Sequence, residues 1–146
     1  MPTPLFLVTA FLMGVILSVY LPMNSSASRY LGSSIAASFS FFVVATATCL
    51  CILLVSGQQQ CLTKLKTVPP YLHIAGIISA FFIIGTTFLV PKIGARTFFI
   101  LLVSGQILMA IVISHFGLLE SPQDPVNLKK LAGALLVIAG AVLSVR

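Results

Sequence analysis

The side chains of this chain that could do chemistry are uncharged polar groups set among long apolar stretches. Gln106 stands about ten residues into one stretch and offers two hydrogen-bond donors and an acceptor. Asn24 follows Pro22, whose ring removes a backbone donor and frees backbone groups nearby. Polar groups in hydrocarbon cost free energy unless they have partners, so they mark candidate sites. The chemistry they indicate is the binding of a solute through hydrogen bonds.

Each candidate also has a structural interpretation, and both interpretations stay open. Gln106 could instead form an interhelical hydrogen bond, which contributes about 1 kcal/mol. Asn24 could cap backbone groups at the Pro22 kink, and Ser40 could serve helix packing. The candidate substrate-path residues are Tyr20, Asn24, Ser40, Ser104, Gln106 and His115.

Helical phase limits which candidates can share a cavity. His115 lies nine residues after Gln106, about half a turn out of phase, and eleven after Ser104, nearly in phase. Gln106 and His115 are therefore not expected to line one cavity unless the helix bends. His115 falls near the lipid headgroups, where a structural role is the alternative. For Tyr20 the alternative is an aromatic residue of the membrane interface.

Acidic groups are scarce, which limits the reactions and substrates open to the chain. The two acids, Glu120 and Asp124, belong to a proline-rich loop. Proton coupling would have to use His73 or His115, or be absent, and a neutral or zwitterionic metabolite fits better than a cation. The sequence has no His-Glu-x-x-His motif, no phosphate loop and no nucleophile elbow. We expect no enzymatic activity, no catalytic residue, no cofactor and no metal site.

Five apolar runs must position these side chains, and they fill most of the 146 residues. A helix needs about 20 residues to cross the hydrocarbon core, and the runs are about that long. With 59% hydrophobic and 7% charged residues, the chain has too few charges to cover a soluble domain. We expect an all-α polytopic membrane protein with a single transmembrane domain over 1–146. Its helices are expected at about 5–23, 35–56, 71–90, 97–119 and 128–145.

The distribution of residues argues against two other classes of protein. Strands of a membrane barrel alternate apolar and polar positions, whereas Leu131–Val142 is continuously apolar. The net charge of +6 comes from cations scattered over loops and helix ends. There they would anchor helices at lipid headgroups, so we expect no nucleic-acid partner. The first run lacks the positively charged start of a signal peptide and is expected to be a retained helix.

The links between runs predict where helices end and pack. Pro22 should kink or end the first helix just before Asn24, which leaves 24–34 as an interfacial link. Residues 91–96 predict a tight turn between the third and fourth helices. Gly133 and Gly140 are seven residues apart and hence on one face, so they favour a tight helix crossing.

Positive charges set the orientation of membrane helices, and here they are evenly split. With five crossings, each side receives four of the eight cations. A balanced chain should insert in both orientations at comparable frequency. The alternative is that the tie is accidental and another determinant fixes one orientation. One set is Lys64, Lys66, Lys129 and Lys130, and the other is Arg29, Lys92, Arg96 and Arg146.

Four segments that cover nearly the whole length match one known pattern. They are Gly14-x9-Asn24, Ser34–Phe41, Ile93–Thr97 with Ser104-Gly105-Gln106 and His115-Phe116-Gly117-Leu118, and Leu128–Gly140. On these segments the chain resembles the drug/metabolite transporter (DMT) superfamily, and within it the YdcZ-type inner-membrane exporters. The resemblance implies a single EamA-like repeat of five helices, a bacterial inner-membrane location and export of a small molecule.

The chain also departs from the family's pattern. The family often has Gln where this chain has Tyr20, and an acidic residue where it has Ser114. An aromatic pair tends to open the third helix, where this chain has Tyr71-Leu72-His73. If those positions set substrate or coupling, the chemistry of this chain differs from that of its relatives.

The resemblance also bears on partners. Larger members of the superfamily carry two such repeats of opposite topology, which implies that this chain is half a transporter. The even charge split independently predicts that a second copy is inserted in the inverted orientation. Inverted repeats are a recurring basis for alternating access. We expect an antiparallel homodimer, or pairing with an oppositely oriented paralogue, in the lipid bilayer. The alternative functions are a non-transporting accessory membrane subunit and a flippase for a lipid-linked substrate.

Overall fold

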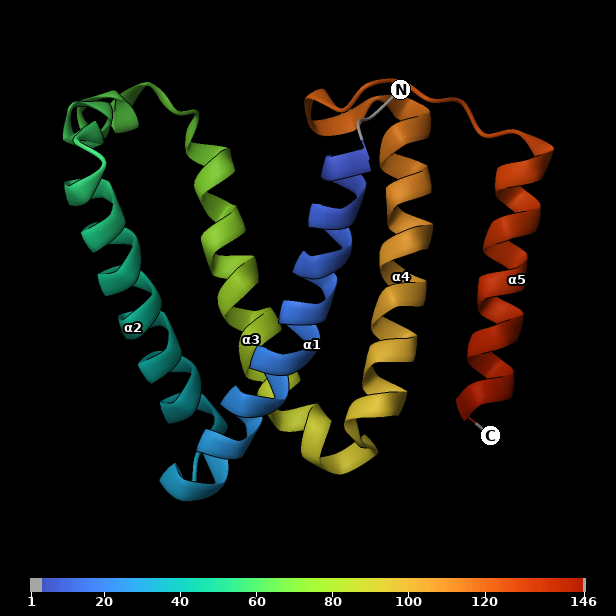
Figure 1. Ribbon diagram of the computed structural model, residues 1–146, viewed down its shortest axis with the longest axis horizontal. Coiled ribbons are helices and arrows are strands. Elements are labelled where there is room, and N and C mark those ends of the chain that lie inside the picture. Colours follow the sequence, from blue (N-terminus) through green and yellow to red (C-terminus); the bar gives the residue numbers. More distant parts are fainter. Residues whose placement is uncertain (1–3, 146) are drawn as a thin grey trace. The chain divides into compact units, whose positions relative to one another are not determined.

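The computed structural model describes residues 4–145, and all of the regular structure in that range is helical (Figure 1). The all-α prediction is thereby confirmed. Short 3-10 helices lie in the connections: η1 (Gln58–Thr67), η2 (Pro70–His73) and η3 (Leu118–Glu120). The α-helices are α1 (Pro4–Leu31), α2 (Ser34–Val55), α3 (Ile74–Ile93), α4 (Ala95–Phe116) and α5 (Leu128–Val145).

Four segments of the described range are long and apolar enough to cross a bilayer. They are Pro4–Leu31, Ser34–Val55, Pro70–Ile93 and Ala95–Phe116, and the shortest have 22 residues. At about 1.5 Å per residue, 22 residues reach about 33 Å, which spans the hydrocarbon core. Large apolar side chains along them stay exposed, as surfaces that face lipid require. The prediction of a polytopic membrane protein is confirmed, and α5 as a fifth crossing remains a prediction.

The chain divides into two compact units, Met1–Lys92 and Ile93–Arg146. The first contains α1, α2 and nearly all of α3, and the second contains α4 and α5. The single transmembrane domain over 1–146 remains a prediction.

The first helix does not end near Pro22, which corrects the predicted end at residue 23 and the predicted link over 24–34. α1 continues to Leu31, and Figure 1 shows it bending along its length. Pro22 costs the helix one N–H donor, but the residues beyond it have no better partners in a membrane than their own helix. The helix stops before Gly32, whose φ of +66° is left-handed.

Small residues bring the helices of the first unit together. Leu21 on α1, Ala37 and Ser38 on α2, and Thr87 on α3 are the most deeply buried residues there, each 1% exposed. Ala37 and Ser38 are small residues at the start of α2, and small side chains allow helices to approach closely. The contact lies at the end of the unit where α1 finishes and α2 begins.

A single residue separates α3 from α4, which corrects the turn predicted over 91–96. α3 begins at Ile74, after η2, and continues through Pro91 to Ile93. Gly94 makes the turn alone, with a φ of +80° and a ψ of 148°, and α4 begins at the next residue. α4 ends at Phe116, earlier than the predicted 119, because Gly117 adopts a left-handed φ of +62°.

In the second unit α4 packs against α5 through alanines. Ala134 and Ala141, seven residues apart, are buried. Gly133 and Gly140, which were predicted to favour a tight helix crossing, do not form this contact, since a methyl group placed on either would meet no atom within 4 Å. The two alanines have the same spacing of seven residues but lie one residue further along, a rotation of about 100° around the helix.

Candidate functional site

A groove between α1 and α2 brings three of the six predicted site residues together. Tyr20 and Asn24 reach it from α1, and Ser40 reaches it from α2. Residues four apart lie on one helix face, which is why Tyr20 and Asn24 meet the same space. The rest of the lining is apolar or small and includes Met23 and Val44. The volume of the groove, about 330 Å³, falls in the range of sites for small ligands.

Aromatic contacts hold α1 against α2 beside this groove. The rings of Tyr20 and Phe41 stack with centroids 5.8 Å apart and planes 11° apart. Phe41 also meets Phe42 edge-on, with centroids 5.3 Å apart. An aromatic pair contributes about 0.5–1.5 kcal/mol beyond the area it buries. Tyr20 therefore contributes to the contact between the two helices by stacking on Phe41.

Asn24 is held by a buried hydrogen bond to the third helix of its unit. Its Nδ2 donates to the Oγ1 of Thr87 on α3 at 2.7 Å. The hydroxyl of Thr87 in turn donates to the carbonyl of Ile83, also at 2.7 Å. Asn24 is 8% exposed, so this pair forms where no water competes for the donors. The amide is thus both part of the groove lining and part of the α1–α3 contact.

A proline explains why Thr87 can bind α1 twice. In an α-helix the N–H of residue 91 would bond the carbonyl of residue 87, and Pro91 has no N–H. The carbonyl of Thr87 is therefore free, and the hydroxyl of Ser25 on α1 donates to it at 3.4 Å, a long bond. The side chain and the carbonyl of Thr87 both face α1 through neighbouring residues, Asn24 and Ser25.

Thr87 and Ser25 are site residues that the sequence reasoning did not identify. The sequence carries a signal for Thr87, because Pro91 follows it by four residues and must leave its carbonyl without a helical partner. A polar residue at that spacing before a proline inside an apolar run is a candidate for contacts with another helix. Ser25 falls in the link predicted over 24–34, so the sequence prediction gives it no contact with another helix.

Two of the other three candidates are midway along α4, in the second unit, and they face different ways. Ser104 lies against α5 in a shallow hollow with Val137 and Ala141, and its hydroxyl donates to the carbonyl of Ile100 at 2.7 Å. Gln106 is exposed. The structure does not bring these two residues to one place.

His115, the remaining candidate, holds the loop that follows α4. Its Nδ1 accepts a hydrogen bond from the N–H of Val126 at 3.1 Å, and the N–H of Asp124 donates to the carbonyl of Ser114 at 2.9 Å. These bonds fold the loop back onto the end of the helix. The hydrogen bond from Val126 to His115 is a structural contact, as the structural interpretation of His115 requires.

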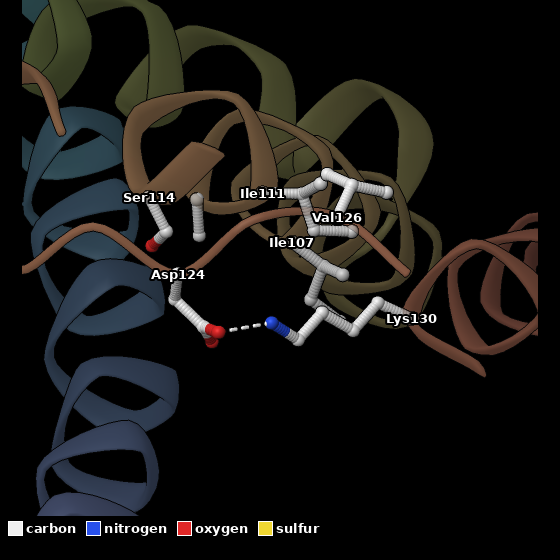
Figure 2. A pocket seen from close by; sticks show the side chains of 7 residues that line it. Ile107, Ile111, Ser114, Asp124, Val126 and Lys130 are labelled. Carbon is white, nitrogen blue, oxygen red and sulfur yellow. Dashed lines mark ion pairs between the residues drawn. The ribbon is translucent and has the colours of Figure 1, made fainter. Parts of the chain in front are cut away.

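The same loop borders a second pocket, of about 220 Å³, in the second unit (Figure 2). Apolar side chains of α4, such as Ile107 and Ile111, form one wall. Asp124 and Lys130 form an ion pair at its edge, and the Nζ of Lys130 also donates to the carbonyl of Pro125 at 3.0 Å. The Asp124 side chain is 66% exposed, so solvent weakens the pair. The contacts of Lys130 with Asp124 and Pro125 hold the loop against the start of α5.

With the two units described, the chain can be compared with known proteins. The sequence model of the family described as "Putative inner membrane exporter, YdcZ" matches residues 5–143. The chain belongs to this family. No curated protein and no solved structure is similar enough to the chain to count as a match. The family match confirms the resemblance that the four sequence segments indicated.

Membership of the YdcZ family gives the general class of the protein. It is a multi-pass protein of the inner membrane, in a family described as exporters rather than as enzymes. The matched span includes both units and all six predicted site residues. Within the described residues, no group of three His, Cys, Asp or Glu side chains could hold a metal ion.

Proposed function

We propose that this YdcZ-family chain exports a small neutral or zwitterionic solute, and that the groove between α1 and α2 is part of the solute's path. The observation that carries the proposal is the convergence of Tyr20, Asn24 and Ser40 on one groove with otherwise apolar or small walls. A few placed polar groups among apolar ones are the usual composition of a small-molecule site. None of the lining residues is a carboxylate or a cation, so an ion of one sign would lose hydration without gaining a counter-charge.

We also propose that two copies pair in opposite orientations and work by alternating access. With α5 as the predicted fifth crossing, the eight cations divide evenly between the two sides, which removes the usual bias toward one orientation. Gln106 gives separate support, because it is exposed midway along a membrane helix, and an amide in lipid needs a hydrogen-bond partner. In the proposed dimer the second copy shields Gln106 from lipid, and the amide joins the path as a binding group for the solute.

Reconstitution of the purified chain in liposomes tests transport directly. Vesicles are screened with a library of labelled neutral, zwitterionic and charged metabolites, with protein-free vesicles as the control. We expect saturable flux of at least one neutral or zwitterionic solute. Absence of flux for every solute would leave the accessory-subunit alternative, and flux of a labelled lipid-linked sugar alone would establish the flippase alternative.

Cysteine labelling at the C-terminus tests the antiparallel homodimer. The native Cys49, Cys51 and Cys61 are exposed, so they are first replaced by serine, and one cysteine is added after Arg146. An impermeant maleimide should then label the protein from each side of intact membranes in comparable amounts. Labelling from one side only would exclude the homodimer and point to an oppositely oriented paralogue.

A further inference from the structure

We infer that the α1–α2 groove selects an uncharged solute that donates a hydrogen bond, and that Thr87 on α3 sets this preference by fixing the amide of Asn24. The inference rests on the proposed function, because it names the class of solute that the proposed path would take. Thr87 does not line the groove itself. Its role is that of a positioning residue, which acts through Asn24.

The hydrogen bonds of Thr87 determine which way the amide of Asn24 is turned. A threonine hydroxyl has one proton, and that proton is given to the carbonyl of Ile83 at 2.7 Å. The Oγ1 of Thr87 can therefore only accept in its second contact, the 2.7 Å contact with Asn24. Because the nitrogen is the donor end of an amide, Asn24 must turn its NH₂ group toward Thr87. Its carbonyl oxygen must then point another way.

That oxygen is available to a solute. The Oδ1 of Asn24 takes part in none of the side-chain hydrogen bonds found among the described residues. Within those residues, no buried side-chain nitrogen or oxygen lacks a partner, so the Oδ1 has to be open to its surroundings. Asn24 is more than nine-tenths buried and lines the groove. The groove is therefore the space in which this acceptor can be reached.

An acceptor of this kind distinguishes solutes by their donors. A solute with an N–H or O–H group can satisfy the Oδ1, whereas a solute that offers only acceptors leaves it unpaired in an apolar site, which is costly. The lining carries no carboxylate to pair with an ammonium group and no cation to pair with a carboxylate. An uncharged amide or alcohol with an apolar body has the chemistry that this groove recognises.

The binding of three benzamides to the protein in lipid nanodiscs tests the preference. Benzamide has two N–H donors, N-methylbenzamide has one, and N,N-dimethylbenzamide has none. The chain has two asparagines, Asn24 and Asn127, so asparagine labelled with ¹³Cγ and ¹⁵Nδ2 gives two amide signals. Asn127 is the internal reference, because its Oδ1 already accepts the N–H of Lys130 at 2.9 Å.

We expect benzamide and N-methylbenzamide to shift the Asn24 Cγ signal and leave Asn127 in place. They should bind about tenfold more tightly than N,N-dimethylbenzamide, the difference expected for one unsatisfied buried acceptor. N-methylbenzamide separates the loss of a donor from the added size of a methyl group. Equal affinity for all three solutes, or no shift of Asn24 with any of them, would overturn the inference.

Variants of two adjacent threonines test the role of Thr87. Thr87→Val keeps the shape of the side chain and removes the hydroxyl, so the amide can turn and the tenfold preference should fall to about twofold or less. Thr87→Ser should restore the preference. Thr86→Val is the matched control, because Thr86 is equally buried, at 2% exposed, and its hydroxyl bonds the carbonyl of Phe82 within α3. Loss of the preference in Thr86→Val, or its retention in Thr87→Val, would exclude a specific positioning role.

The binding series tests the inference about Asn24 and Thr87, and the flux screen tests the proposed function, so a failure of one can be distinguished from a failure of the other. If the benzamides discriminate as expected but no solute crosses the liposome membrane, the groove is a selective site in a protein that does not transport, and the proposed function fails. If solutes cross but the benzamides bind without discrimination, the proposed function stands and the inference about Asn24 and Thr87 fails.

Discussion

The hydrogen bond between Asn24 and Thr87 should contribute measurably to the stability of the first unit. The atoms lie 2.7 Å apart, and both residues are buried, at 8% and 1% exposed. Side-chain hydrogen bonds between membrane helices contribute about 0.6 kcal/mol on average and about 1.7 kcal/mol at most. Because this pair is short and screened from water, we expect a coupling energy of about 1 kcal/mol between Asn24→Ala and Thr87→Val.

A double-mutant cycle measures this coupling through reversible unfolding in mixed detergent micelles, with the two single variants and the double variant compared with the parent chain. The control cycle combines Asn24→Ala with Thr86→Val, whose hydroxyl bonds its own helix, and should give a coupling near zero. If the Asn24–Thr87 coupling were no larger than that of the control cycle, the hydrogen bond would not form in the membrane. The orientation assigned to the Asn24 amide would then lose its basis.

Three further substitutions test other parts of the structure. Gln106→Ala should lower flux in liposomes about fivefold or more, the value of one hydrogen bond to solute, while chemical crosslinking should show dimers at the parent level. Asp124→Asn should leave flux within about twofold, because its ion pair with Lys130 is partly exposed. Loss of flux in Asp124→Asn with normal flux in Gln106→Ala would place the functional element in the loop. Gly117→Ala should lower the free energy of unfolding by about 1–2 kcal/mol, because residue 117 is left-handed and its new methyl group would lie 2.5 Å from a loop side chain. Gly133→Ala, in open space on α5, is the control and should not destabilise the protein.

The helices could be predicted from the sequence because length and apolarity alone require them in a membrane. Their ends were harder to predict, since a proline inside a membrane helix ends the helix less readily than it would in water. Pro22 and Pro91 both lie inside helices that continue past them. In a membrane the surrounding backbone groups have no solvent to bond, so losing one donor is less costly than ending the helix. The helix ends are set instead by glycines with positive φ, such as Gly94 and Gly117.

Part of the candidate site could also be predicted. Tyr20, Asn24 and Ser40 are polar or signature residues of the first two helices. Helical spacing places Tyr20 and Asn24 on one face of α1, and the packing of α2 against α1 adds Ser40 to the groove. The partner of Asn24 could not be predicted, because it depends on how deep α3 lies against α1. Thr87 is separated from Asn24 by 63 residues, and only the packed structure shows that they meet. For Gln106 the position along the helix could be predicted, but no partner could be assigned.

Gly94 has a mechanical consequence for this chain. It is the one residue between α3 and α4. Its φ of +80° with a ψ of 148° lies in a region that is open to glycine and strained for other residues. Any hinge motion between the helix before it and the helix after it must be absorbed by this residue's two torsion angles, or by unwinding a helix end. The connection from α3 to α4 is therefore a turn whose conformational freedom is that of one glycine, and no flexible loop lies between the two helices.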